Sequence, residues 1–109
     1  MAGATARTED GGMNTLHIEH AITEFGVWKA AFDRFAEMRR DAGVRRHRIA
    51  QPVDDAHYVL VDLDFATAEE ARKFLGFLQT SVWNTGNAPA LVGQPQTRIL
   101  ELADEYSES

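Results

Sequence analysis

Three ionisable side chains stand close together near the start of the chain: His17, Glu19 and His20. The alternation of polar and apolar residues around them predicts a β-strand over residues 15–22, in which side chains two positions apart share a face. His17 and Glu19 therefore lie side by side, and a histidine oriented by a carboxylate can serve as a general base near neutral pH. His17 and His20 are three positions apart and face opposite sides, so no metal ion is expected between them.

Asp62 joins this group from a second predicted strand, because it faces the same side of the sheet as His17. Two interpretations stay open. In the first, His17, Glu19 and Asp62 form a catalytic group with the histidine as the base. In the second, they form a network of hydrogen bonds and ion pairs at a subunit interface, together with Arg46 or Arg48.

His20 offers a competing site on the other face of the first strand, where its neighbours are apolar. The helix that follows would bring Trp28 and Phe32 close to it, which makes a pocket with aromatic walls and few polar groups. His20 is then either the base of that pocket or a core histidine whose hydrogen bonds are satisfied within the fold. Arg39 falls inside the apolar stripe of the same helix, where it either reaches a ligand carboxylate or extends to solvent near the helix end.

The elements that position these groups follow one another in the order strand, helix, strand, strand, helix, strand. Strands are predicted over 15–22, 44–51, 57–65 and 97–103, one helix between Thr23 and Gly43, and the other from Thr67 to Val82. Thr23 and Thr67 are the expected N-caps, and Gly43 suits a C-cap with positive φ. Glycine and proline residues between 83 and 95 predict an irregular connection.

This order predicts an α+β protein with the ferredoxin-like βαββαβ fold: a four-stranded antiparallel sheet, strand order 4-1-3-2, with both helices on one face. The other face is left uncovered. The last strand carries apolar residues on both of its sides, with Ile99 on one and Leu100 and Leu102 on the other. A twofold homodimer in which two such sheets face each other would cover that surface.

Length and composition restrict the class of protein further. The 109 residues suffice for one domain, predicted over 15–103 between disordered tails at 1–14 and 104–109. With no cysteine, the chain can form neither a disulfide nor a thiolate metal site. A net charge of −6 disfavours nucleic-acid binding. No apolar run suits a membrane span or a secretory signal, so a cytoplasmic protein is expected.

Six segments carry a resemblance to a known group: LHIEHAI, FGVWKAAFDRF, AGVRRHRI, PVDD, YVLVDLDF and EEARKFLGFL. From about residue 16 to residue 102, the chain resembles the dimeric α/β-barrel superfamily, which includes antibiotic-biosynthesis monooxygenases, stress-responsive barrel proteins and small polyketide cyclases. The resemblance implies a homodimer whose sheets form a barrel, with a small-molecule pocket between the sheet and the helices of each protomer. Enzymes of this group commonly work without a metal or an organic cofactor, while some members bind haem.

Together these features predict a cofactor-independent enzyme of the monooxygenase or cyclase type that acts on an aromatic or polyketide-like substrate. The alternatives are a non-catalytic homodimeric barrel protein that binds a hydrophobic small molecule, and a haem-binding member of the group. Trp83, Asn84 and Arg98 are of the types with which some family monooxygenases stabilise a substrate anion. No cofactor and no metal are expected. The candidate catalytic residues are His17, Glu19, His20 and Asp62, and the candidate substrate-binding residues are Trp28, Phe32, Arg39, Tyr58 and Trp83.

Overall fold

The computed structural model describes residues 13–84 and 90–106 of the chain. Its strands are β1 (Asn14–Ile22), β2 (Arg46–Ala50), β3 (Tyr58–Phe65) and β4 (Leu91–Glu101). Its helices are α2 (Phe25–Arg34), α3 (Ala36–Asp41) and α4 (Ala68–Phe77), and a π-helical turn, η1 (Leu78–Val82), continues α4. Within the described ranges, no helix is long and apolar enough to cross a membrane. Most of the predicted tails, and residues 85–89 of the predicted connection, lie outside the described residues.

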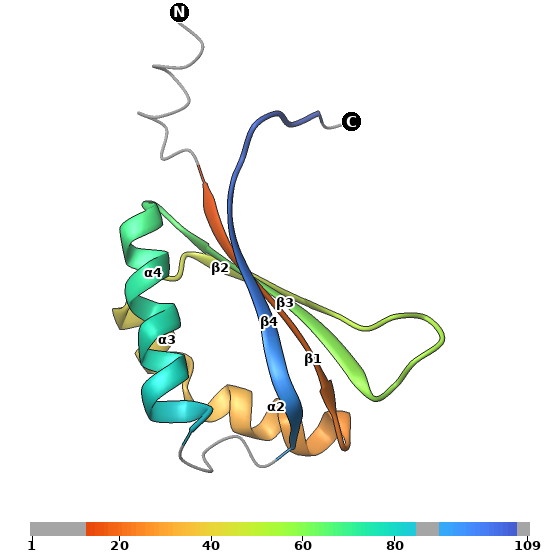
Figure 1. Ribbon diagram of the computed structural model, residues 1–109. Coiled ribbons are helices and arrows are strands. Elements are labelled where there is room, and N and C mark those ends of the chain that lie inside the picture. Colours follow the sequence, from red (N-terminus) through yellow and green to blue (C-terminus); the bar gives the residue numbers. More distant parts are fainter. Residues whose placement is uncertain (1–12, 85–89, 107–109) are drawn as a thin grey trace, which may run out of the picture.

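The four strands form one antiparallel sheet in the order β2-β3-β1-β4. The central strands β1 and β3 pair with His17 opposite Asp62. Figure 1 shows α2, α3 and α4 on one side of this sheet, and no described helix on the other. The ferredoxin-like α+β fold and the strand order expected from the sequence are thereby confirmed.

The hydrophobic core lies between the sheet and the helices, and the two-residue period of the central strands builds it. In β1, Leu16, Ile18 and Ile22 are buried on the helix side, whereas His17 and Glu19 are half-buried on the other side. The buried apolar residues of β3 alternate in the same way and are Val59, Val61, Leu63 and Phe65. In both central strands the residues alternate between the two faces as expected. The polar residues of the open face are therefore separated from His20, which lies within the core.

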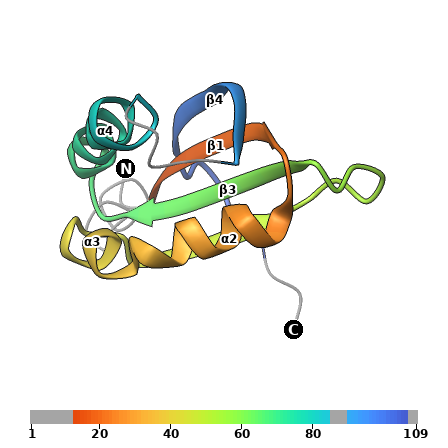
Figure 2. The same cartoon turned by 90° about the horizontal axis from the view of Figure 1, so that it is seen from below.

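The first predicted helix is divided into two helices at Phe35. This residue has φ −101° and ψ 18°, and its N–H donates to the carbonyl of Phe32 at 3.2 Å, as in a 3₁₀ turn. The Arg39 guanidinium donates a further hydrogen bond to the Phe32 carbonyl, at the end of α2 where helical partners run out. The break turns α3 away from the direction of α2, which can be followed in Figures 1 and 2.

Two of the predicted caps are present. Gly43 follows α3 with φ 107°, a left-handed conformation that suits glycine at this position. At the start of α4, Thr67 Oγ1 accepts a hydrogen bond from the Glu70 N–H at 3.1 Å. The Glu70 carboxylate turns toward Gly43, where a Cβ would lie 2.9 Å from Glu70 Oε2. A side chain at position 43 would therefore also require the Glu70 carboxylate to shift.

The prediction of Thr23 as an N-cap is wrong. Helix α2 begins after Glu24, and no side chain caps it. Thr23 is held through its backbone instead, because its N–H donates to the Ala90 carbonyl at 2.9 Å and its carbonyl accepts from His57 Nδ1 at 2.9 Å. These bonds tie the end of β1 to the β2–β3 connection and to the approach to β4.

Strand β4 begins earlier than predicted, so residues 91–95 belong to the sheet and not to an irregular connection. The pairing register of β1 with β4 shifts between Glu19 and Ala21. Gly93, with φ 75°, and Pro95 lie in β4 at this irregularity. A bulge on an edge strand accommodates both residue types, which along the sequence indicate a break in structure.

Candidate functional site

A pocket lies between the sheet and the helices, and we refer to it as the helix-side pocket. Its walls come from β1, β3, α2, α3, α4, η1 and the start of β4. The cavity has a volume of about 80 Å³. An apolar cavity of about 150 Å³ accepts benzene, so a ring-sized ligand requires these walls to move apart. His20 and Arg39 are the ionisable side chains among the described residues that line it.

His20 occupies the β1 wall of the helix-side pocket and is 4% exposed. Its Nδ1 lies 3.1 Å from the Ala21 carbonyl and donates to it, since a carbonyl oxygen can only accept. Burial lowers the pKa of His20, and the hydrogen bond to Ala21 opposes only part of that effect. The imidazole is therefore neutral near pH 7. Its Nε2 is then an acceptor, and it has no hydrogen-bond partner among the described residues.

Trp28 and Phe32 of α2 form an aromatic wall beside His20. Their rings are stacked, with centroids 5.1 Å apart and planes 22° from parallel, and the His20 ring lies 6.1 Å from that of Trp28. Phe25 supports Trp28 at 5.8 Å, and His47 of β2 meets Phe32 edge-on at 5.2 Å. Residues 25, 28 and 32 share one face of the helix, so the sequence pattern predicts this wall correctly.

Arg39 of α3 lies beyond Phe32 in the same pocket and is 7% exposed. Its guanidinium carbon is 3.6 Å from the centroid of the Phe32 ring, and Nη1 donates to the Phe32 carbonyl. Burial lowers the pKa of Arg39, and the charge of Asp33 partly opposes this. Arginine nevertheless remains protonated in proteins. Of the two expectations for Arg39, extension to solvent is wrong.

A further wall of the helix-side pocket comes from Leu78, Val82 and Trp83. The Trp83 N–H donates to the Leu78 carbonyl at 2.7 Å, the five-residue spacing of a π-turn. The wider turn brings Trp83 to the pocket together with Leu78. A π-turn has no recognisable sequence pattern, so the sequence identified Trp83 by residue type and resemblance alone.

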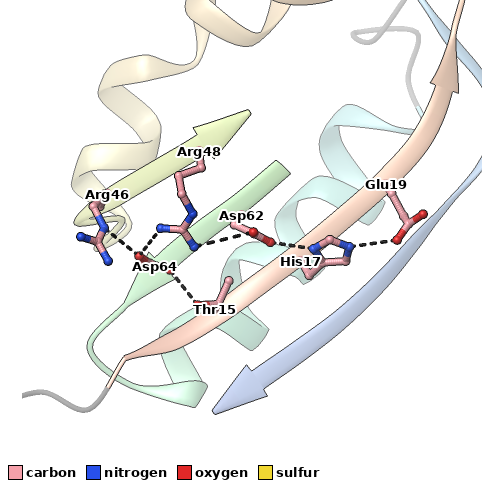
Figure 3. A network of polar contacts seen from close by, with 7 residues as sticks. All are labelled: Thr15, His17, Glu19, Arg46, Arg48, Asp62 and Asp64. Atoms are coloured by element: carbon pink, nitrogen blue, oxygen red, sulfur yellow. Dashed lines mark hydrogen bonds and ion pairs between the residues drawn. The ribbon is translucent and has the colours of Figure 1, made fainter. Parts of the chain in front are cut away.

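A second polar group lies on the open face of the sheet, and Figure 3 shows most of it. His17 is at its centre, with Nδ1 2.6 Å from Asp62 Oδ1 and Nε2 2.9 Å from Glu19 Oε2. The Tyr58 hydroxyl donates to Glu19 Oε1 at 2.7 Å, and Arg48 Nη2 lies 3.6 Å from Asp62 Oδ2. We call this group the sheet-face network; its members are Thr15, His17, Glu19, Arg46, Arg48, Tyr58, Asp62 and Asp64.

The two carboxylates favour the charged form of His17. Burial lowers the pKa of His17, but the hydrogen bonds to Glu19 and Asp62 outweigh burial and raise the pKa above 6.5. The hydrogen bond from His17 in turn lowers the pKa of Glu19. Both nitrogens of a protonated imidazole donate, so neither is free to accept a proton. This arrangement favours a structural or interface network over a catalytic group.

Asp64 extends the sheet-face network toward β2, and it is a residue that sequence reasoning missed. The residue is 1% exposed although it lies on the open face. Thr15 Oγ1 donates to it at 2.7 Å, Arg46 Nε at 3.1 Å and Arg48 Nη1 at 3.2 Å. Burial raises the pKa of Asp64, but these three donors outweigh burial and lower it. The sequence signal that could have identified Asp64 is the pair Arg46 and Arg48, which share one face of the neighbouring strand.

The structure therefore divides the predicted site residues between the two faces of the sheet. Arg98, one of the residues of anion-stabilising type, pairs with His17 in the register of β1 and β4, and so lies on the open face. Asn84 is exposed. In ranges 13–84 and 90–106, no three histidine, aspartate or glutamate residues are grouped to hold a metal ion. The helix-side pocket contains His20, Trp28, Phe32, Arg39 and Trp83, and the sheet-face network contains His17, Glu19, Tyr58 and Asp62.

Comparison with known proteins gives matches in structure but not in sequence. No protein-family profile matches the chain, and no curated protein sequence matches it. A variant of SnoaB, a cofactor-independent oxygenase from Streptomyces nogalater, matches with a TM-score of 0.69 and 15% identity over 89% of this chain and 99% of the other. A monooxygenase from the gene ActVA-Orf6 of Streptomyces coelicolor, solved with nanaomycin D, matches with a TM-score of 0.67 and 11% identity. The match covers 92% of this chain and 96% of the other.

A dimeric ferredoxin-like protein from an uncultured marine organism matches with a TM-score of 0.61 and 11% identity, over 90% of this chain and 94% of the other. At identities this low, the structural matches establish the fold alone, and any activity must be argued from the site. The resemblance expected from the sequence is thus confirmed in the fold: the chain has the ferredoxin-like architecture that antibiotic-biosynthesis monooxygenases and dimeric ferredoxin-like proteins share.

Proposed function

We propose that this protein is a cofactor-independent enzyme of the monooxygenase type that acts on an aromatic or polyketide-like substrate in the helix-side pocket. The observation that carries the proposal is the buried, neutral imidazole of His20 in a pocket with aromatic walls. Two proteins of the same fold add support, since SnoaB is described as a cofactor-independent oxygenase and the ActVA-Orf6 protein as a monooxygenase.

His20 takes the role of general base. Its Nδ1–H is committed to the Ala21 carbonyl, which leaves Nε2 as the proton acceptor. Because burial keeps the pKa of His20 below 6.5, the base is unprotonated at neutral pH without assistance from a carboxylate. The apolar walls exclude water, so a proton taken from an acidic C–H or phenol is not exchanged at once with solvent.

The reaction that follows needs no external reductant. Removal of a proton from an activated methylene leaves an electron-rich carbanion, which transfers electrons to O₂. One oxygen atom stays on the carbon as a carbonyl and the other leaves as water, so that CH₂ and O₂ become C=O and H₂O. The chain's contribution is to bind the ring system, remove the proton and stabilise the resulting anion.

The functional unit in this proposal is a homodimer joined through the open faces of two sheets. Apolar side chains surround the sheet-face network, with Val92 and Leu100 of β4 both exposed and Leu60 of β3 half-buried. The strand register places all three on the open face, opposite Ala21, Thr15 and Glu19 respectively. Neighbours of this fold are described as dimeric, and a twofold pair would cover these side chains.

Binding without catalysis is the second candidate function. It is favoured by the scarcity of polar groups in the helix-side pocket, where His20 and Arg39 are the ionisable side chains among the described lining residues. Such a pocket binds an apolar guest whether or not His20 removes a proton from it.

Oxygen consumption with anthrone tests the proposal, because anthrone carries an acidic methylene between two aromatic rings and gives anthraquinone. We expect the wild-type chain to consume one O₂ per anthraquinone, faster than buffer alone. The His20→Gln variant should lose about 100-fold or more in kcat/KM, the usual contribution of a general base. The wild-type kcat/KM should fall with decreasing pH through a midpoint below 6.5, because protonation removes the acceptor.

A parallel His17→Gln variant decides between the two histidines, and His57→Gln, a change at an exposed ring, is the matched control. Greater loss in His17→Gln than in His20→Gln would assign the base to the sheet-face network and overturn the proposal. Anthrone that raises the unfolding temperature without oxygen uptake would establish the binding function instead.

A further inference from the structure

We propose that Arg39 is the anion-binding residue of the helix-side pocket, and that the ligand is a flat aromatic compound with a carboxylate or similar oxyanion at one end. The inference rests on the proposed function only in taking this pocket as the ligand site. It adds a requirement on the ligand that the general-base chemistry of His20 does not impose.

Arg39 is a buried cation without a carboxylate partner among the described residues. It is 7% exposed, and no ion pair joins it to an acidic side chain there. Asp33 acts on its charge from a distance, but the Asp33 carboxylate is already held by Lys29 Nζ at 2.8 and 3.0 Å. An uncompensated buried charge is unfavourable, and a ligand anion would compensate it.

The guanidinium keeps hydrogen-bond donors for such a ligand. It carries five N–H donors, of which Nη1 serves the Phe32 carbonyl. The face of the group rests on the Phe32 ring at 3.6 Å, which fixes its plane. Because Arg39 also lines the cavity, its remaining donors are available to a planar oxyanion, and carboxylates suit that geometry.

The position of Arg39 sets the shape of the ligand. The stacked rings of Trp28 and Phe32 lie between its guanidinium and His20. The guanidinium carbon is 3.6 Å from the Phe32 centroid, the Phe32 and Trp28 centroids are 5.1 Å apart, and those of Trp28 and His20 are 6.1 Å apart. A flat ring system lying along this wall would place its anionic group on Arg39 and its acidic C–H or phenol near His20. The ligand class is therefore an extended aromatic acid whose charged group is remote from the reacting atom.

A purely structural role for Arg39 is the competing explanation, since its bond to the Phe32 carbonyl caps the end of α2. A cap affects stability and makes no distinction between a ligand acid and its amide. Equilibrium binding of 2-naphthoate and 2-naphthamide, which have the same ring system and differ in charge, separates the two roles. Calorimetric titration without O₂ measures this independently of turnover.

We expect the wild-type chain to bind 2-naphthoate at least about tenfold more tightly than 2-naphthamide, as a charge-assisted hydrogen bond provides. The Arg39→Met variant keeps an apolar stem and should lose this preference, whereas Arg39→Lys should keep part of it. Arg40→Met, at the exposed neighbouring position, is the matched control and should behave as wild type. Thermal unfolding of each variant reports the loss of the cap separately.

Equal affinity for acid and amide in the wild-type chain would overturn the inference, and so would a preference that survives in Arg39→Met. Failure of both compounds to bind at millimolar concentration would also overturn it, because the pocket would then not admit an aromatic ring. Acid selectivity without oxygen consumption from anthrone would leave the anion site in place and remove the proposed oxygenase activity. Oxygen consumption without acid selectivity would leave the proposed oxygenase activity in place and remove the anion site.

Discussion

The pKa values of His17 and His20 shift in opposite directions although the two residues are three positions apart on one strand. His17 lies between two carboxylates that stabilise its protonated form, and His20 lies among apolar groups that destabilise it. Residue type is the same in both cases, so the neighbours alone decide which imidazole can accept a proton at neutral pH.

The charge on His17 predicts a specific dependence of stability on pH. The folded chain has a pKa for His17 above 6.5, so it binds this proton more tightly than the unfolded chain does. The stabilisation is therefore complete below 6.5 and is lost as the pH rises through the folded-state pKa. We expect His17→Gln to be less stable than wild type by about 1 kcal/mol at pH 6, with a smaller difference at pH 9.

Urea denaturation at a fixed protein concentration measures this difference at each pH. In a Glu19→Gln background, the change between pH 6 and pH 9 should be smaller, because one of the two carboxylates that hold His17 is gone. A difference that is constant across this range would contradict a charged His17.

The sequence was sufficient to place these residues and insufficient to assign their roles. Strand alternation put His17, Glu19 and Asp62 on one face and His20 on the other, because the period of a strand is independent of the rest of the fold. Arg39 lies within the apolar stripe but near the predicted helix end, where a long side chain can also reach solvent. For that reason the sequence left two orientations open for Arg39, and the structure excludes the extension to solvent.

The connection from α3 to β2 depends on a single backbone conformation. Gly43 has φ 107°, and the Glu70 carboxylate of α4 packs against the space where a side chain would begin. The turn thus links the position of α3, and with it Arg39, to the position of α4.

Substitution of two glycines by alanine should have effects of opposite sign. Gly43→Ala introduces a Cβ at positive φ, 2.9 Å from Glu70 Oε2, and should destabilise the fold by about 1 to 2 kcal/mol. Gly76→Ala, the matched control within α4, meets no atom within 4 Å and should stabilise by up to about 1 kcal/mol. Thermal unfolding of both variants measures this, and equal effects would contradict the strained turn.

Three features of the elements escaped prediction because each depends on tertiary contacts. The break at Phe35 accompanies a bond from the Arg39 side chain, and the π-turn of η1 places Trp83 in a pocket wall. The bulge in β4 absorbs Gly93 and Pro95, which taken locally indicate a loop. Patterns of residue types predict the kind and order of elements, whereas these irregularities follow from what the elements pack against.

In the whole molecule, one face of the sheet is covered by helices and the other carries a charged network with apolar side chains around it. Leu100 is 43% exposed on that face, and the register pairs it with Thr15. An antiparallel sheet tolerates one face in water, but the exposed apolar residues favour a partner.

Association through this face predicts that Leu100→Lys separates the proposed dimer. Twofold symmetry brings the substitution into the interface twice, so two lysines lose water on association. We expect the wild-type chain to sediment at low micromolar concentration with twice the 12.1-kDa chain mass, and Leu100→Lys with the chain mass. Val53→Lys, in the β2–β3 loop that projects from the sheet in Figure 1, is the matched control and should stay dimeric.

A wild-type chain that remains at 12.1 kDa at all concentrations would contradict the proposed dimer. Dimers of Leu100→Lys as tight as those of wild type would place the interface elsewhere on the molecule.

Strand β1 presents alternate residues to two separate environments, since odd positions such as 17 and 19 belong to the open face and even positions such as 18 and 20 to the core. Selection can therefore act on one set of positions while the other set stays fixed. In the proposed dimer, substitutions at the even positions would alter the pocket inside each subunit and leave the surface between subunits unchanged.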